Sequence, residues 1–218
     1  MPIKTIDKYL KLIKERPSDF SKGKLEIITD KNAILKYEKE NNCDLGLLYE
    51  STYHLLVKDL VKDGDNFFTY ERVLKKNPSN AIVIIPKYKD KFVLLNQFRH
   101  SIRNYQLCFP RGFGEPNISV EENAYKELKE ELGVKTLSYQ LLGKVVADSG
   151  LCGEKVSICL CDITKPILKN NYEGINDIKI VNFRDFTSLI NTGKIDDGYT
   201  LSAFSLYTIS KIKIQNFF

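Results

Sequence analysis

One sharply bounded helix constrains this chain more than any other feature of its sequence. The helix is expected over residues 120–132, and it separates two groups of short apolar runs. Ser119 precedes it and Glu122 follows three residues later, which is the pattern of a capping box at a helix start. Gly133 comes directly after the last expected turn, where a glycine often ends a helix. Strands before and after a lone central helix favour an α/β fold with a mixed sheet packed between helices.

Short apolar runs predict the strands on both sides of this helix. Before the helix, two such runs are joined by Asp63-Gly64-Asp65, which is typical of a β-hairpin. The expected strands are 54–61, 67–74, 81–86, 92–98, 139–147, 155–163 and 178–183, and two closing helices are expected at about 185–191 and 199–211.

The beginning of the chain has a different pattern. Residues 3–16 carry apolar side chains at helical spacing, and Pro17-Ser18-Asp19 ends that stripe. A short strand is expected at 25–28 and a polar helix at 31–41. We therefore expect an N-terminal helical accessory segment over residues 1–50 and a larger domain over residues 51–218 that includes the hairpin.

The composition is that of a globular protein without a membrane span. Of the 218 residues, 43% are hydrophobic and 28% are charged. No apolar run approaches the roughly 18 residues needed to cross a bilayer, and the N-terminus lacks the apolar stretch of a secretory signal. The five cysteines include no Cys-x-x-Cys pair, so we interpret them as reduced thiols of a cytoplasmic protein.

The net charge of +5 comes from lysines scattered along the chain. A nucleic-acid-binding protein more often has a dense basic stripe or an aromatic RNA-binding motif, so we do not expect a nucleic-acid partner. An RNA-cap hydrolase is disfavoured for the same reason. A mild positive charge still suits a small polyanionic substrate.

Carboxylates gather on one part of the expected central helix. Glu127 and Glu131 are four residues apart and share a helix face, and Glu130 flanks them. One interpretation is a solvated acidic face that pairs with neighbouring lysines. The other is a cluster for a hard divalent cation, because Mg²⁺ prefers oxygen ligands and is typically held by one or two carboxylates, water and substrate phosphates. Taken alone, the helix leaves both interpretations open.

The sequence around the helix favours the metal interpretation. The segment 112–134 resembles the box of the Nudix hydrolase superfamily, which begins with a glycine and ends in Arg-Glu-apolar-x-Glu-Glu-x-Gly-apolar. Two positions depart from that pattern: Ile118 stands where the family has glutamate, and Lys126 stands where it has arginine. In the family these two side chains pair and brace the loop against the helix. The resemblance therefore implies intact metal ligands and an altered brace.

The resemblance extends over roughly residues 50–212. Segments 97–100 and 109–116 are similar to the approach to the box in ADP-ribose pyrophosphatases and related sugar-nucleotide hydrolases. Segment 148–154 resembles their loop after the box, although it lacks that loop's proline, and segment 190–200 resembles their final loop and helix start. The resemblance implies a Nudix fold and the Mg²⁺-dependent hydrolysis of the diphosphate bond in ADP-ribose or a related nucleotide sugar. The products would be a nucleoside monophosphate and a sugar phosphate.

The resemblance also implies roles for individual residues. The metal, Mg²⁺ with Mn²⁺ as an alternative, is assigned to Glu127, Glu130, Glu131 and the backbone carbonyl of Arg111. The general base is expected either in the loop 170–177, where Glu173 is the first choice, or at Glu131. A base must reach the attacking water directly or through one other water. A solvated loop acid is the alternative for Glu173.

Two residues are candidates for substrate binding. Arg99, at the end of an expected strand, offers a fork of donors to a phosphate, with a surface ion pair as the alternative. Glu154 matches a glutamate of the subfamily's loop after the box, with a solvated loop acid as the alternative. Ile118 and Lys126 motivate a second hypothesis, a nucleotide-binding or sensor domain with weakened catalysis. The resemblance further implies a homodimer, to which the hairpin could contribute.

Overall fold

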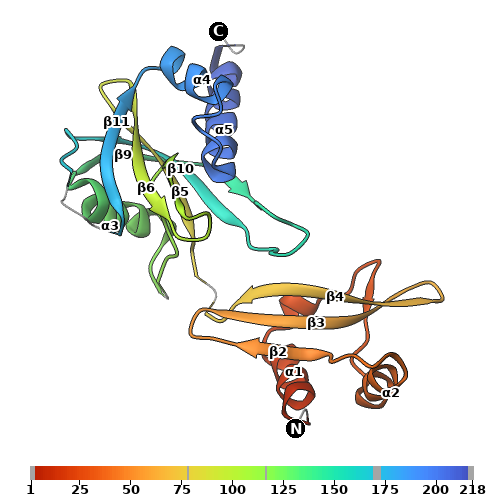
Figure 1. The fold of residues 1–218 in the computed structure, drawn as a ribbon. Coiled ribbons are helices and arrows are strands. Elements are labelled where there is room, and N and C mark those ends of the chain that lie inside the picture. Colours follow the sequence, from red (N-terminus) through yellow and green to blue (C-terminus); the bar gives the residue numbers. More distant parts are fainter. Residues whose placement is uncertain (1–2, 78, 116, 169–172, 216–218) are drawn as a thin grey trace. The chain divides into compact units, whose positions relative to one another are not determined.

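The computed structural model describes residues 3–77, 79–115, 117–168 and 173–215. The chain forms two compact units, one of Met1–Pro78 with Asp148–Glu154 and one of Ser79–Ala147 with Lys155–Phe218 (Figure 1). Each unit has its own sheet and its own hydrophobic core. Within the described ranges, no helix is long and apolar enough to cross a membrane.

The first unit is built around the predicted hairpin. Strand β3 pairs antiparallel with β4 along its whole length, and it also pairs with the shorter strands β1 and β2. Apolar residues of the first helix and of β3, among them Tyr9 and Val57, meet in one core. The elements are α1 (Ile3–Glu15), the 3₁₀ helix η1 (Pro17–Phe20), β1 (Glu26–Ile27), α2 (Lys31–Asn41), β2 (Gly46–Glu50), β3 (His54–Asp63) and β4 (Asn66–Lys75).

The hairpin therefore groups with the N-terminal segment, whereas the sequence analysis placed it in the domain that starts at residue 51. The pairing of β3 with β1 and β2 causes this grouping. Segment 148–154 also belongs to the first unit, because the backbone N–H of Val73 donates to the carbonyl of Leu151 at 2.9 Å. The independence of residues 1–50 as a domain stays a prediction.

The second unit contains a mixed seven-stranded sheet in the order β11-β6-β5-β10-β9, with β7 paired to β6 and β8 paired to β5. Strands β5 and β10 run parallel, and the other pairs are antiparallel. The strands are β5 (Ile82–Tyr88), β6 (Lys91–Arg99), β7 (Asn104–Cys108), β8 (Arg111–Gly112), β9 (Thr136–Val145), β10 (Val156–Ile163) and β11 (Ile175–Val181).

Helices cover both faces of this sheet. Helix α3 (Val120–Leu132) packs on one face, and α4 (Phe183–Asn191) and α5 (Gly198–Gln215) pack on the other (Figure 1). The first four residues of the central strand β5 are apolar because both of its faces are buried there: Ile82 and Ile84 face the α3 core, and Val83 and Ile85 face the α4–α5 core. The predicted fold class, a mixed sheet between helices, is thereby confirmed.

Candidate active site

Local capping fixes where α3 starts and ends. The hydroxyl of Ser119 accepts from the backbone N–H of Glu122 at 3.1 Å, and the Glu122 carboxylate accepts from the backbone N–H of Ser119 at 2.8 Å. Gly133 ends the helix in the left-handed conformation, with a φ of 64°. The predicted capping box and glycine cap are both confirmed. These caps fix the bounds of the helix that carries the glutamates.

Glu131 is turned into the protein. Its side chain is 2% exposed, and its Oε2 atom has no hydrogen-bond partner among the described residues. Burial, followed by the negative charge of Glu127, raises the pKa of Glu131 to about 8. A solvated helix face does not hold a carboxylate in this way, so that interpretation is excluded for Glu131.

Glu127 lies directly against the backbone of β8. A Cβ atom built on Gly112 would come within 2.0 Å of Oε1 of Glu127, so any residue other than glycine would displace this carboxylate from its position. Gly112 is itself held in place by its pairing with Ile82 of β5. Burial raises the pKa of the Glu127 carboxyl, and the charge of Glu130 raises it further. Gly112 and Glu127, which the family motif places fifteen positions apart, are thus in direct contact.

Glu173 comes close to the two helix glutamates from a different part of the chain. Its charge contributes to the raised pKa of both Glu127 and Glu131. The turn that carries it is tied to β6, since the Gln97 side-chain amide donates to the Glu173 carbonyl at 3.0 Å. Residues 170–172, the beginning of the predicted loop, lie outside the described residues.

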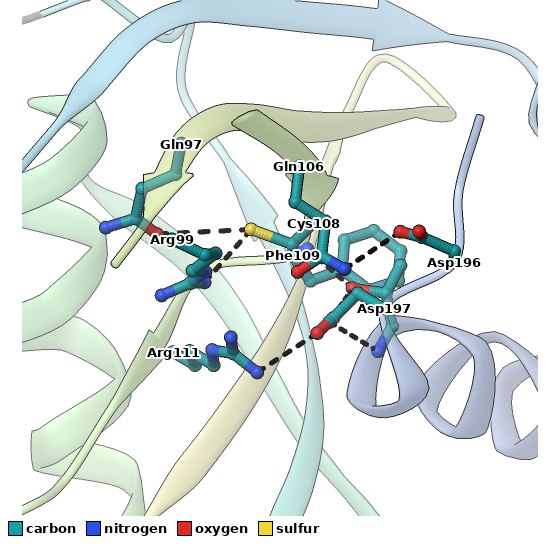
Figure 2. A network of polar contacts seen from close by, with 9 residues as sticks. Gln97, Arg99, Gln106, Cys108, Phe109, Arg111, Asp196 and Asp197 are labelled. Carbon is teal, nitrogen blue, oxygen red and sulfur yellow. Dashed lines mark hydrogen bonds and ion pairs between the residues drawn. The ribbon is translucent and has the colours of Figure 1, made fainter. Parts of the chain in front are cut away.

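Two guanidinium groups face this acidic cluster. The charges of Arg99 and Arg111 both lower the pKa of Glu131, against the larger effect of burial. Arg99 donates from Nη2 to the Sγ atom of Cys108 at 3.0 Å, while its Nε is buried without a partner among the described residues. Arg111 donates from Nη1 to Oδ1 of Asp197 at 3.2 Å (Figure 2). Among the described residues, Arg99 therefore does not form the surface ion pair that was its alternative.

Asp197 is a part of this arrangement that the sequence analysis did not single out. It precedes α5, and its Oδ2 accepts from both the backbone N–H and the hydroxyl of Thr200, at 3.0 and 2.7 Å. The Thr200 hydroxyl in turn accepts from the backbone N–H of Phe109 at 2.9 Å (Figure 2). An aspartate directly before a helix is an N-cap signal, but it does not predict the contact with Arg111.

The loop between β8 and α3 is braced by residues other than the pair expected in the family. Lys126 forms an ion pair with Glu115 instead of with residue 118. The side-chain amide of Asn80 donates to the carbonyl of Ile118 at 2.9 Å, and the buried Asn123 amide donates to the carbonyl of Asn80 at 2.9 Å. The loop is thus fixed to α3 in spite of the two departures.

Glu154 is found in the first unit, not in the second. Its Oε1 lies 2.5 Å from Nζ of Lys75, and its side chain is 25% exposed. This ion pair argues against the alternative that Glu154 is only a solvated loop acid. Its predicted role in substrate binding stays a prediction.

The donor set around Glu131 fits a hard divalent cation. Among the described residues, no three His, Cys, Asp or Glu side chains form a ready-made metal site. Mg²⁺ does not require one, since it is usually bound by one or two carboxylates and completes its shell with water and phosphates. The unpartnered Oε2 of Glu131 and the Glu127 carboxylate seated on Gly112 supply the oxygen atoms for such binding.

Comparisons with known proteins support the fold and the family of this chain. The curated relative ADP compounds hydrolase NudE of Escherichia coli (strain K12) is 30% identical over 97 residues, which are 44% of this chain and 52% of that protein. The chain thus spans about half the length of this relative. A solved structure described as an ADP compounds hydrolase has a TM-score of 0.68 at 20% identity, covering 78% of this chain and 91% of the other, and it supports the fold.

The family comparison covers the site itself. The NUDIX domain family matches residues 76–201, which include β8, α3 and the residues around Asp197. This match confirms the resemblance that the sequence predicts from Gly112 to Val134. The chain belongs to the NUDIX family.

Proposed function

We propose that this chain hydrolyses the diphosphate bond of an ADP-linked compound, with ADP-ribose or a related nucleotide sugar as the substrate. The observation that carries the proposal is the buried, unpartnered carboxylate oxygen of Glu131, with Glu127 beside it and two guanidiniums facing it. This reaction needs carboxylates that bind a metal ion and positively charged side chains that bind the phosphates. The names of the relative and of the structural neighbour favour ADP as the nucleotide part.

The metal ligands in this proposal are Glu127, Glu130 and Glu131, together with the backbone carbonyl of Arg111. Bound Mg²⁺, or Mn²⁺ in its place, would neutralise phosphate charge and polarise the phosphorus. Glu127 and Glu131 hold their carboxylates close together at a cost in electrostatic energy, as their raised pKa values indicate. A site that concentrates negative charge in this way is prepared for a cation.

The chemical step is the attack of water on one phosphorus of the diphosphate. A P–O bond forms to the water oxygen, the bridging P–O bond breaks, and the water proton passes to a carboxylate. Glu173 is the first candidate for this base, because it is exposed on a turn tied to β6 and its charge acts on both helix glutamates. Glu131 is the rival. The products are a nucleoside monophosphate and a sugar phosphate.

Arg99 is proposed to contact the phosphates. Its side chain comes from the end of β6, and its charge acts on Glu131. The contact of its Nη2 with a thiol sulfur is weaker than a carboxylate contact would be. Arg99 is therefore not neutralised by a carboxylate in the described part of the chain, and a phosphate can take that place.

A nucleotide-binding or sensor domain with weakened catalysis is the second candidate function. The observation in its favour is the departure from the family pattern at Ile118 and Lys126. Against it stands the ion pair of Lys126 with Glu115, together with the Asn80 and Asn123 hydrogen bonds, which brace the same loop.

A substrate panel with Mg²⁺ and with Mn²⁺ tests the proposal. It should contain ADP-ribose, nucleotide sugars, dinucleoside polyphosphates and nucleoside triphosphates, with products separated by chromatography. We expect AMP and a sugar phosphate from ADP-ribose or a nucleotide sugar. Binding of ADP-ribose in calorimetry without turnover of any compound would favour the sensor function instead. The homodimer stays a prediction that light scattering in solution can check.

A further inference from the structure

The side chain of Arg111 is held in one orientation by two contacts. Its Nη1 donates to Oδ1 of Asp197 at 3.2 Å, and its guanidinium carbon lies 5.3 Å from the centre of the Tyr199 ring. A guanidinium over an aromatic face is favourable, above all where water is partly excluded, and this side chain is 25% exposed. The group is thus fixed in place and still accessible.

Asp197 is a rigid partner for this guanidinium. It is 6% exposed, and its second carboxylate oxygen is used by the backbone and hydroxyl of Thr200 at the start of α5. Because that oxygen is occupied, the contact with Arg111 involves a single oxygen of Asp197 and not a two-pronged fork. If Arg111 served only to neutralise the buried Asp197, we would expect two parallel hydrogen bonds to both carboxylate oxygens, which is the stronger geometry.

The guanidinium of Arg111 has more donors than its hydrogen bond with Asp197 uses. A guanidinium has five N–H donors, and Asp197 is the hydrogen-bond acceptor that Arg111 contacts among the described residues. Its charge acts on Glu131, as does that of Arg99. A cluster of glutamates repels a diphosphate unless positive groups besides the cation are present, and a fixed fork of donors suits phosphate oxygens.

We infer that the guanidinium of Arg111 binds a phosphate of the substrate and that Asp197 is the positioning residue that orients it. This inference rests on the proposed function, and it gives the Arg111 side chain a role apart from that of its backbone carbonyl. Tyr199 supports the same orientation from the start of α5. Substrate affinity therefore depends on residues that lie 86 positions apart in the chain.

The test compares three single variants and one double variant by steady-state kinetics. Arg111→Lys keeps the charge but loses the fork, so we expect KM to rise about tenfold, with kcat and the Mg²⁺ concentration for half-maximal activity changed less than about threefold. Asp197→Asn has one acceptor oxygen, which cannot serve both Arg111 and Thr200, so KM should rise by a smaller factor. Arg184→Lys, an exposed arginine of α4, is the matched control and should behave as the unaltered protein.

The double variant separates positioning from general damage to the fold. If Asp197 acts through Arg111, adding Asp197→Asn to Arg111→Lys raises KM no further. Thermal unfolding of each variant shows how much stability is lost, and a stability loss alone would not change KM selectively. Unchanged KM in a folded Arg111→Lys, or fully additive effects in the double variant, would overturn the inference.

The role of Arg111 can still be tested if the protein turns out not to be a hydrolase. Should the unaltered protein hydrolyse no compound, calorimetric binding of ADP with Mg²⁺ replaces KM as the readout. Weaker binding by Arg111→Lys would support the inference without the enzyme. Equal binding by both proteins, or none by either, would overturn it.

Discussion

Two carboxylates in this molecule are equally buried and differ in what surrounds them. Asp59 in the first unit and Glu131 in the second are each 2% exposed. Asp59 accepts from the Tyr9 hydroxyl at 2.5 Å on one oxygen and from Nε of Arg72 at 2.6 Å on the other. Glu131 has an oxygen without a partner among the described residues, and burial raises its pKa to about 8.

The difference shows that a buried carboxylate can have either a structural or a functional role. Around Asp59 the cost of removing a charge from water is offset by a cation and a hydroxyl, so the carboxylate joins α1 to the β3–β4 hairpin. Around Glu131 that cost is offset only in part by the charges of Arg99 and Arg111, and one carboxylate oxygen has no hydrogen-bond partner in the described part of the chain. An incompletely compensated buried carboxylate in a cluster of charges is the pattern of a functional group. Each of the following predictions tests this distinction.

The largest effect is expected from Glu131→Gln. The amide keeps the shape of the side chain but is a poor metal ligand and no base, so kcat/KM should fall by roughly a thousandfold, the scale of losing one strong electrostatic group. The free energy of unfolding at neutral pH should stay the same or increase, because glutamine avoids the cost of keeping a buried carboxyl protonated. Steady-state kinetics and urea denaturation measure both quantities. A variant as active as the unaltered protein would remove Glu131 from the site.

Asp59→Asn should give the opposite result. Loss of the charge leaves the Arg72 guanidinium, which also donates to the Asp19 carbonyl at 2.8 Å, without its buried counter-ion. We expect the free energy of unfolding to fall by about 3 kcal/mol, as for other broken buried pairs, while kcat of the folded protein is retained. Urea denaturation and kinetics at low temperature provide the check. A catalytic defect at full stability would contradict the structural role.

The pH dependence of stability should separate the two groups further. In metal-free protein the pKa of Glu131 is raised to about 8, against about 4.3 for glutamate in an unfolded chain. The folded state therefore binds this proton more tightly. Its stabilising effect is complete below about pH 4 and is lost as the pH rises through about 8, a change on the order of 5 kcal/mol.

Urea denaturation with a chelator at several pH values measures this trend. Glu131→Gln should lose this part of the pH dependence, and saturating Mg²⁺ should reverse it because a cation favours the ionised carboxylate. Equal pH dependence in the variant and in the unaltered protein would count against the raised pKa.

A smaller and more selective effect is expected from Gly112→Ala. The added methyl would occupy the position of the Glu127 carboxylate, which is the flexible end of a side chain and can move. We expect the Mg²⁺ concentration for half-maximal activity to rise about tenfold, similar to other losses of metal-site support, with little change in thermal stability. Gly143→Ala, whose new methyl would lie 3.4 Å from Leu206, is the matched control. Equal Mg²⁺ dependence of both variants would rule out the contact with Glu127 as important.

The smallest effect is expected at the substitute brace. The Lys126–Glu115 ion pair is partly exposed, with side-chain exposures of 38% and 57%, and exposed pairs contribute little. Lys126→Glu should lower kcat by no more than about threefold, and adding Glu115→Lys should restore it. Restoration in the double variant identifies the pair as the cause. A large loss in Lys126→Glu that the second change does not rescue would point to a direct role for Lys126.

The elements that the sequence predicts well are those set by local signals. Helix α3 spans the predicted residues 120–132 and α2 spans the predicted 31–41, because caps and turn residues act within a few positions. Strands β7 and β8 are not among the strands that the sequence predicts. Their identity depends on pairing with β6 and β5, and a five-residue or two-residue strand has no period of its own to detect.

In the site, too, the sequence predicts the features set by local spacing and not those set by long-range contacts. The sequence places Glu127 and Glu131 on one helix face, and their spacing from Gly112 proves to be a contact. Other contacts of the site join segments that are far apart in the chain. They are the approach of Glu173 to the helix glutamates, the hydrogen bond of Arg111 with Asp197, and the hydrogen bonds of Asn80 and Asn123. Such contacts are a property of the sheet topology, which a motif does not encode.

Segment 148–154 has a consequence for the order in which this protein is made. Residues 79–147 of the second unit are synthesised before Leu151, whose carbonyl accepts from the backbone N–H of Val73 in the first unit. The hydrogen bond from the Tyr70 hydroxyl to Gly150 and the ion pair of Lys75 with Glu154 wait for the same segment. The unit that is translated first is therefore completed late, and its outer strand β4 stays without these partners while much of the second unit is being made.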